Sequence, residues 1–198
     1  HTRYPLVTGV QPCALPISSA RGAEIVDVDG HRYLDLALGD TAAMAGHAPD
    51  AVVRAVADQL HRGSTTMLPS EASVEVGEEL ARRFGLPLWQ LVLTATDANR
   101  FALRLARMVT GRPKVLVHNW CYHGTVDETF ATADPSGAAG AAVTRPGNLG
   151  PQANPSSTTR VVEINDLATT EAALACGDVA AVLVEPALTN IGIVLPDE

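Results

Sequence analysis

The chain of 198 residues is 46% apolar and 18% charged, a composition typical of a globular protein with one good core. Its 14 basic and 22 acidic residues give a net charge of −8, which argues against a general nucleic-acid or anionic-membrane surface and favours small-molecule partners. The longest apolar run, VAAVLV at 179–184, is far shorter than a membrane span, and the three cysteines follow no disulfide or CxxC spacing, so we expect a cytoplasmic protein.

Residues 1–17 are predicted to be a non-native segment. Within it, VTGVQPCALPI resembles the translation of a short-read sequencing adaptor, with one difference at Pro12. The alternative is a genuine leader, but the segment has no adequate apolar h-region and carries two prolines in its last six residues. We therefore expect a hairpin and helix segment at 18–65 and the first part of a larger domain at 66–198.

The N-terminal elements are predicted from turn chemistry and helical periodicity. The segment EIVDVDGHRYLDL has apolar residues on both sides of Asp29-Gly30, a pair that favours a two-residue β-hairpin. Two amphipathic helices are expected next, at 50–62 and 71–84. Their apolar stripes consist of Val52, Val53, Val56 and Leu60 in the first helix, and of the inward-facing Val74, Leu80 and Phe84 in the second.

From residue 90 onward the predicted elements alternate between strands and helices. In chain order they are a strand at 91–93, a helix at 97–110, strands at 114–119 and 160–164, a helix at 166–176 and a strand at 179–185. This alternation predicts an α/β fold whose mostly parallel sheet has helices on both faces. Residues 131–159 are rich in Gly, Pro, Ala and Ser without an apolar period, so we expect a long loop there.

A candidate binding site lies where the helix at 97–110 begins. In Thr94-Ala95-Thr96-Asp97 small side chains allow backbone N–H groups to approach an anion, and two hydroxyls add donors at the positive end of the helix. A phosphate group fits this arrangement. The alternative is an ordinary N-cap, with Thr96 or Asp97 capping the helix and nothing bound. The spacing alone leaves both interpretations open.

Further candidates follow the predicted strands. Glu185-Pro186 ends the last strand at the carboxyl edge of the sheet, where open α/β folds bind their ligands, although a plain strand-end charge is an equal alternative. Asn190 falls in the same loop region. Tyr122, taken alone, is more often a core residue than a platform for a cofactor ring.

Several other classes of site lack their sequence signature. There is no GxGxxG, no Walker A lysine and no GxSxG, which argues against the corresponding nucleotide-binding and hydrolase classes. We expect no metal site, because three neighbouring potential ligands lack a fourth at a recognised spacing and lie at a strand end where side chains alternate. These three residues are His118, Cys121 and His123.

Five segments, in this order, resemble the class III aminotransferases, a family of pyridoxal-phosphate enzymes that includes glutamate-1-semialdehyde aminomutase. They are DVDGHRYLD, AGHAP, TATDA followed by ALRLAR and TGR, CYHG, and VEPALTNIGIVLP. The resemblance covers about residues 22–198. It implies a fold type I transferase with an αβα sheet, incomplete in this chain, in which residues 66–198 begin the large domain that binds pyridoxal 5'-phosphate.

The resemblance also implies roles for individual residues. The family's Ser-Gly-Thr phosphate turn falls on Thr94, Ala95 and Thr96, its cofactor-stacking aromatic on Tyr122 and the adjoining histidine on His123, its strand-end glutamate on Glu185, and an asparagine near the cofactor's 3-hydroxyl on Asn190. Two positions depart from the pattern, with Ala95 in place of Gly and Asp97 in place of Glu. Alanine keeps the N–H free but does not readily reach a positive φ, so the turn must lie in an ordinary backbone region or be strained.

The family's Schiff-base lysine and the aspartate that pairs with the pyridine nitrogen both lie well after the strand at 179–185, so we expect them beyond residue 198. Lys114, the one lysine in the chain, matches no catalytic position. The resemblance thus implies the N-terminal portion of a homodimeric aminotransferase that moves an amino group from an amino acid or amine to a keto acid or aldehyde, and this portion alone is expected to be inactive. An aminomutase of the glutamate-1-semialdehyde type and a non-catalytic pyridoxal-phosphate-binding protein are the alternatives.

Overall fold

The structure is a computed structural model that describes residues 16–148 and 154–197. The chain divides into two compact units at the boundary between Val74 and Glu75. Residues 1–15 of the predicted non-native segment lie outside the described residues, whereas Ile17 opens the first strand. Among the residues described, no helix is long and apolar enough to cross a membrane.

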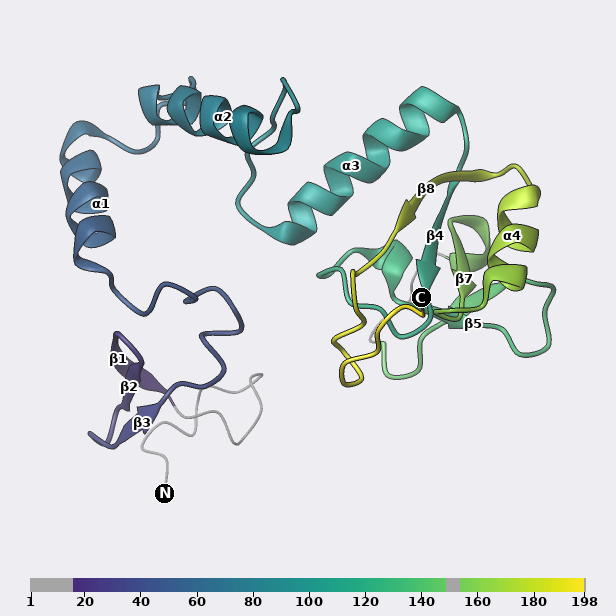
Figure 1. Ribbon diagram of the computed structural model, residues 1–198, viewed down its shortest axis with the longest axis horizontal. Coiled ribbons are helices and arrows are strands. Elements are labelled where there is room, and N and C mark those ends of the chain that lie inside the picture. Colours follow the sequence, from purple (N-terminus) through teal and green to yellow (C-terminus); the bar gives the residue numbers. More distant parts are fainter. Residues whose placement is uncertain (1–15, 149–153, 198) are drawn as a thin grey trace. The chain divides into compact units, whose positions relative to one another are not determined.

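The first unit contains a three-stranded antiparallel sheet and a helix (Figure 1). The strands pair in the order β1 (Ile17–Arg21), β2 (Glu24–Asp27) and β3 (Arg32–Leu34). The helix is α1 (Asp50–Arg62), with the bounds predicted from periodicity. The hairpin formed by β2 and β3 is therefore confirmed, and so is the helix.

The turn between β2 and β3 is longer than the predicted two-residue turn. The backbone N–H of Asp27 donates to His31 O at 3.0 Å, which leaves three residues in the loop, with Gly30 at a φ of 88°. Such a three-residue loop ends in a left-handed residue that forms a bulge. The buried Asp27 carboxylate sets this length, because it accepts hydrogen bonds from the N–H groups of Asp29 and His31 and from the Tyr33 hydroxyl.

The second unit is built on a parallel sheet with the strand order β7-β4-β8. The central strand β4 (Lys114–His118) pairs in parallel with β7 (Thr159–Val162) and with β8 (Val179–Leu183). Its middle residues are almost fully buried, as expected for a strand covered on both faces. The predicted parallel sheet is confirmed.

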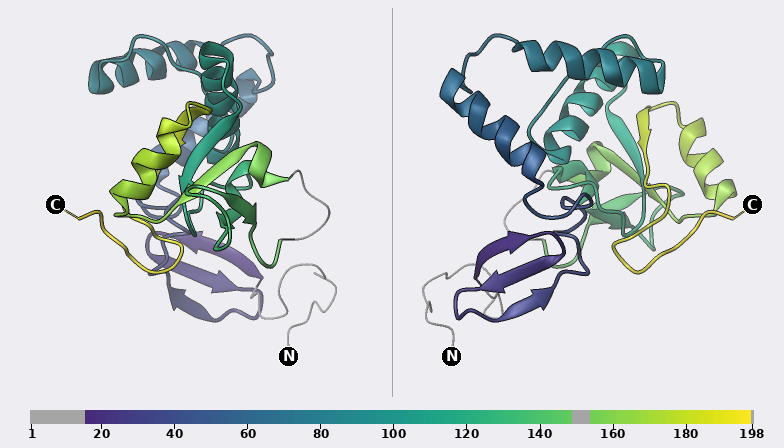
Figure 2. Two further views of the ribbon diagram at one scale, coloured as in Figure 1. Left: turned by 90° about the vertical axis from the view of Figure 1, so that its right-hand side faces the viewer. Right: turned by 60° about the vertical axis from the view of Figure 1, so that its left-hand side comes forward.

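Helices cover both faces of this sheet. On one face Val115 and Val117 of β4 pack in a cluster with Leu103 of α3 (Ala95–Thr110). On the other face Leu116 packs with Ala173 of α4 (Leu167–Ala175), and Figure 2 shows α4 alongside the strands. Because successive side chains of a strand point to opposite faces, this alternation produces the expected three-layer αβα arrangement.

Two sequence predictions for this unit are wrong. Residues 91–93 form no strand: Leu93 is 99% exposed, and three apolar residues do not make a strand without a partner to complete the hydrogen-bond ladder. The segment at 131–159 is not one loop. It contains an antiparallel hairpin whose small side chains, Ala131 and Ala142, reach the core. The added elements are η1 (Asp127–Thr129), just before the segment, and β5 (Ala131–Ala133), β6 (Ala142–Thr144) and η2 (Pro155–Ser157) within it.

The amphipathic stripes of the two N-terminal helices are not buried. Helix α2 (Glu71–Phe84) has the predicted bounds, but Val74 and Phe84, expected to face inward, are mostly exposed. Phe84 instead packs against Trp89, with ring centroids 5.6 Å apart. Periodicity identifies such a stripe, but burial needs a partner surface, which no local pattern supplies. The stripe of α1 is exposed in the same way at Val52, Val53, Val56 and Leu60.

Candidate functional site

Helix α3 begins with a capped turn that leaves two backbone donors available. Thr94 is the N-cap: its hydroxyl accepts from the N–H of Asp97 at 3.1 Å and donates to the Asp97 carboxylate at 2.8 Å. The N-cap alternative is thus realised by Thr94, and not by Thr96 or Asp97. The N–H groups of Ala95 and Thr96 form no hydrogen bond within the described residues, so they stay available at the positive end of the helix.

The substitution of alanine for the family's glycine causes no strain. Ala95 is the first residue of α3 and is not among the residues with positive φ. The turn therefore lies in an ordinary backbone region, where any L-residue fits.

The loop after β4 lies directly on this turn. The Thr96 hydroxyl accepts a hydrogen bond from the N–H of Thr125 at 3.0 Å, and the Asn99 amide donates to the carbonyl of His123 at 3.0 Å. Gly124 has a φ of 76°, and a Cβ on it would lie 2.2 Å from the Thr96 hydroxyl oxygen. Only glycine allows the loop to come this close to the helix.

A carboxylate joins the same loop to the segment after β8. One oxygen of Glu185 accepts from the N–H of Tyr122 at 2.7 Å, and the other accepts from the N–H and the hydroxyl of Thr189, both at 3.0 Å. The Asn190 amide donates to Trp120 O at 3.3 Å. Burial opposes the ionisation of Glu185, but the hydrogen bonds from Tyr122 and Thr189 hold its pKa below the ordinary value.

The residues that the sequence analysis selected are thus brought together. The turn at 94–96, Tyr122, Glu185 and Asn190 meet where β4 and β8 end, at the carboxyl edge of the parallel sheet. The structure thus places them at one edge of the sheet. The role of each residue in binding a cofactor stays a prediction.

Two histidines lie under this edge with unsatisfied ring nitrogens. His123 is 8% exposed, and its Nε2 atom is buried without a hydrogen-bond partner in the described residues; the same holds for Nδ1 of His118. Burial lowers the pKa of both rings, against the opposing charge of Glu185, so both are neutral at pH 7. Within the part of the chain that is described, no group of three His, Cys, Asp or Glu side chains could hold a metal ion.

Four residues of the site were missed in the sequence. Gly124 had a usable signal, since a glycine directly after CYH suggests a close backbone approach. The contacts of Asn99, Thr125 and Thr189 join segments far apart in sequence or use backbone atoms, so periodicity and spacing carry no sign of them.

Removing the Glu185 carboxylate is expected to loosen the two loops that it joins. In Glu185→Ala the N–H groups of Tyr122 and Thr189 lose their acceptor, so their hydrogen exchange should accelerate by at least about tenfold, the equivalent of about 1.4 kcal/mol. Exchange measured residue by residue by NMR checks this. Glu171→Ala, a change at an exposed position of α4, is the control and should leave both rates unchanged.

The sequence comparisons agree with this architecture. The sequence model of the family described as "Aminotransferase class-III" matches residues 7–198. A glutamate-1-semialdehyde 2,1-aminomutase of Desulfitobacterium hafniense is 38% identical over 183 residues, which cover 91% of this chain and 42% of the relative. The chain thus spans less than half the length of the curated relatives it matches.

Solved structures give the same picture. A glutamate-1-semialdehyde-aminomutase from Pseudomonas aeruginosa PAO1 is 56% identical with a TM-score of 0.86, covering 93% of this chain and 40% of that one. A variant of it was crystallised in complex with PMP. An omega-transaminase from Sphaerobacter thermophilus is 32% identical with a TM-score of 0.80, covering 94% of this chain and 44% of that one.

Proposed function

The chain belongs to the class-III aminotransferase family, and on that premise we propose that the edge where β4 and β8 end forms part of a binding site for pyridoxal 5'-phosphate. The residues proposed to hold it are Thr94, Ala95, Thr96, Tyr122, His123, Glu185 and Asn190. One observation carries the proposal: Thr96 binds the loop that presents Tyr122, and Glu185 binds the same loop from the other side. The turn proposed to bind the phosphate and the backbone that carries Tyr122 are thereby held at the same edge.

The donor set of this edge fits such a group. The free N–H groups of Ala95 and Thr96 suit a phosphate dianion, since they lie at the positive end of a 16-residue helix. The exposed ring of Tyr122 offers a flat apolar surface. The buried, unpaired Nε2 atom of His123 is a polar atom that a bound group could satisfy.

When bound, the cofactor supplies an electron sink that lets an amino group be transferred. The chain's own residues would bind and orient it. The N-terminus of α3 would hold the phosphate, the neutral rings of His118 and His123 would add no charge beside the site, and Glu185 would stay ionised as a fixed acceptor for the loop.

Binding of pyridoxamine 5'-phosphate, which requires no lysine, tests the proposal. In Thr96→Val the loop loses its acceptor on α3, so the affinity measured by fluorescence titration is expected to fall by about tenfold or more. The matched control is Thr110→Val at the other end of the same helix, where the hydroxyl donates to the carbonyl of Ala106 and accepts from the N–H of Arg112, away from the proposed site. Absence of saturable binding, or an equal loss in both variants, would overturn the assignment of the site.

The proposed activity of a protein that contains this site is amino transfer between a small-molecule donor and acceptor, in a homodimer. An aminomutase is the second candidate, favoured by the 56% identity to the Pseudomonas aeruginosa protein. In a protein that contains this chain and a catalytic lysine, the requirement for a keto acid distinguishes the two reactions. Consumption of glutamate-1-semialdehyde without any added keto acid supports the aminomutase, and dependence on a keto acid supports the aminotransferase.

A further inference from the structure

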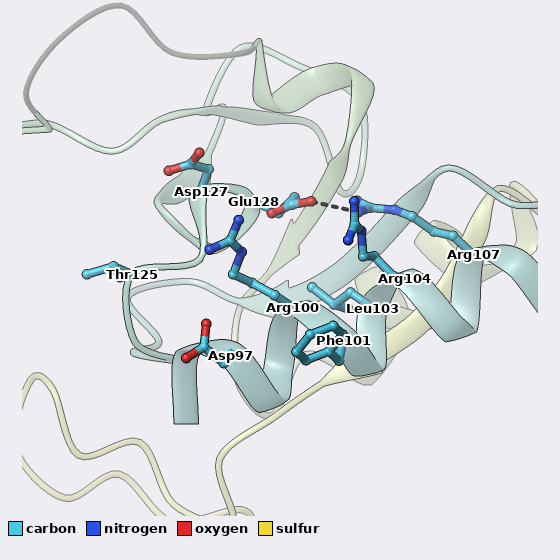
Figure 3. Close-up of a pocket in the computed structure, with 9 residues that line it drawn as sticks. All are labelled: Asp97, Arg100, Phe101, Leu103, Arg104, Arg107, Thr125, Asp127 and Glu128. Atoms are coloured by element: carbon cyan, nitrogen blue, oxygen red, sulfur yellow. Dashed lines mark hydrogen bonds and ion pairs between the residues drawn. The ribbon is translucent and has the colours of Figure 1, made fainter. Parts of the chain in front are cut away.

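A cavity lies along α3, against the loop at 125–128. Its volume is about 620 Å³, within the range of about 300–1,000 Å³ typical of small-molecule sites. Figure 3 shows its lining, which combines basic and acidic side chains with one aromatic ring. None of the residues proposed to hold the cofactor lines this cavity, so its role is independent of the proposed function.

Three arginines one helical turn apart form the basic wall. Arg107 is already engaged: it donates to Pro113 O at 2.8 Å and pairs with Glu128 at 2.6 Å, while its Nη2 atom is buried without a partner. Arg100 and Arg104, at positions i−7 and i−3 from it, form no hydrogen bond or ion pair within the described chain. The cavity thus has two guanidinium groups with no counter-ion in contact.

The acidic side chains of the lining come from both α3 and the loop at 125–128, and most of them have partners. Glu128 is paired with Arg107, and this hydrogen bond, together with the charge of Arg100, holds its pKa below the ordinary value although burial opposes that shift. Asp97 accepts from the Thr94 hydroxyl at the positive end of α3. The Asp127 carboxylate has no side-chain partner in the described residues. Two guanidinium groups that form no ion pair in the described residues therefore share the cavity with one carboxylate that has no side-chain partner there.

This charge pattern selects the kind of ligand. A simple anion would satisfy the guanidinium groups but would be repelled by Asp97 and Asp127, and a polyanion would be repelled more strongly. A molecule with two carboxylates and one ammonium ion matches the two guanidinium groups of Arg100 and Arg104 and the carboxylate of Asp127. Phe101, 46% exposed, adds apolar surface for its methylene groups.

We propose that this cavity binds an acidic α-amino acid, with its carboxylates on Arg100 and Arg104 and its ammonium ion on Asp127. A carboxylate on a guanidinium forms charge-assisted hydrogen bonds, which are stronger than those between neutral groups. An amino acid in this cavity would contact α3, the helix whose first turn binds the loop that carries Tyr122.

Calorimetric titration of the 198-residue chain with L-glutamate tests the proposal. One saturable site is expected, and Arg104→Gln and Asp127→Asn are each expected to weaken it by about tenfold or more. Arg54→Gln, at an exposed arginine of α1 in the first unit, is the matched control and should leave the affinity unchanged. Circular dichroism confirms that each variant is folded, and Arg104→Lys replaces Arg104→Gln if that variant loses helix signal.

Glutarate, which lacks the ammonium ion, separates this site from a plain anion site. It should bind about tenfold more weakly than glutamate, and Asp127→Asn should remove the difference between them. The proposal is overturned if glutamate shows no saturable binding, if glutarate or sulfate binds as well as glutamate, or if the Arg54 control loses as much affinity as the cavity variants. Self-association of the chain without glutamate binding also overturns the proposal if Arg104→Gln abolishes that self-association. A second copy of the chain would then occupy the cavity.

Discussion

Replacing Gly124 by alanine is expected to abolish high-affinity binding of pyridoxamine 5'-phosphate, with a loss of about 100-fold or more. The added Cβ would lie 2.2 Å from the hydroxyl oxygen of Thr96 and 3.2 Å from its Cα, at a φ of 76° that alanine rarely adopts. Since the α3 backbone is fixed by its own hydrogen bonds, the loop must move away, and Tyr122 moves with it. The free energy of unfolding should fall by about 2–5 kcal/mol, the sum of the backbone and packing costs.

A second glycine separates these two costs. Gly111 ends α3 with a φ of 67°, but no atom outside its neighbours lies within 4 Å of the Cβ that alanine would add. Gly111→Ala should therefore cost only the backbone term, about 1–2 kcal/mol, and leave the affinity for the ligand intact. Urea unfolding and ligand titration of both variants measure this. Equal effects on affinity in the two variants would mean that contact between the loop and Thr96 does not shape the site.

Lys114 is expected to carry no pyridoxyl group after the chain is mixed with pyridoxal 5'-phosphate and reduced with borohydride. Lys114 begins β4, at the amino end of the sheet, and its Nζ atom lies 3.2 Å from the carboxylate of Asp178. The site lies past the other end of the strand, roughly 13 Å away at about 3.3 Å per residue. The ion pairs of Asp178 with Arg160 and Lys114 hold the pKa of this carboxyl at about 2, so the contact persists at neutral pH.

Mass spectrometry of the proteolysed chain detects the adduct on Lys114 directly. The variant Asp178→Asn frees the amine and should show only slow, substoichiometric labelling, which makes it a control for accessibility. Amino transfer should be undetectable in both. Stoichiometric labelling of Lys114 in the unaltered chain, together with amino transfer, would show that this lysine is catalytic after all.

Local signals in the sequence predict most of the second unit. Helix α3 and the strands β4, β7 and β8 come from periodicity, capping residues and apolar runs, all of which act within one element. The predicted loop between β2 and β3 was too short. Its length depends on the buried carboxylate of Asp27, which accepts hydrogen bonds from three later residues, outside β2. The strand predicted at 91–93 failed because strand formation depends on a partner that no local pattern supplies.

The candidate site was accessible from the sequence only in part. The turn at 94–97 could be read as a cap or as an anion site, and the structure shows a cap that leaves two N–H groups free. The contact of Glu185 with the N–H of Tyr122 joins residues 63 positions apart and uses a backbone donor, which leaves no trace in residue spacing. The family resemblance, and not the chemistry of single residues, selected these positions together.

An NMR titration of the chain with pyridoxamine 5'-phosphate tests the central claim most directly. If the turn at 94–96 and the Tyr122 loop hold the ligand, the largest saturable changes in chemical shift occur at the amides of Ala95, Thr96, Tyr122 and His123. Changes confined to the first unit, or centred on Arg100 and Arg104 while the amides of Ala95 and Thr96 stay unmoved, would contradict it.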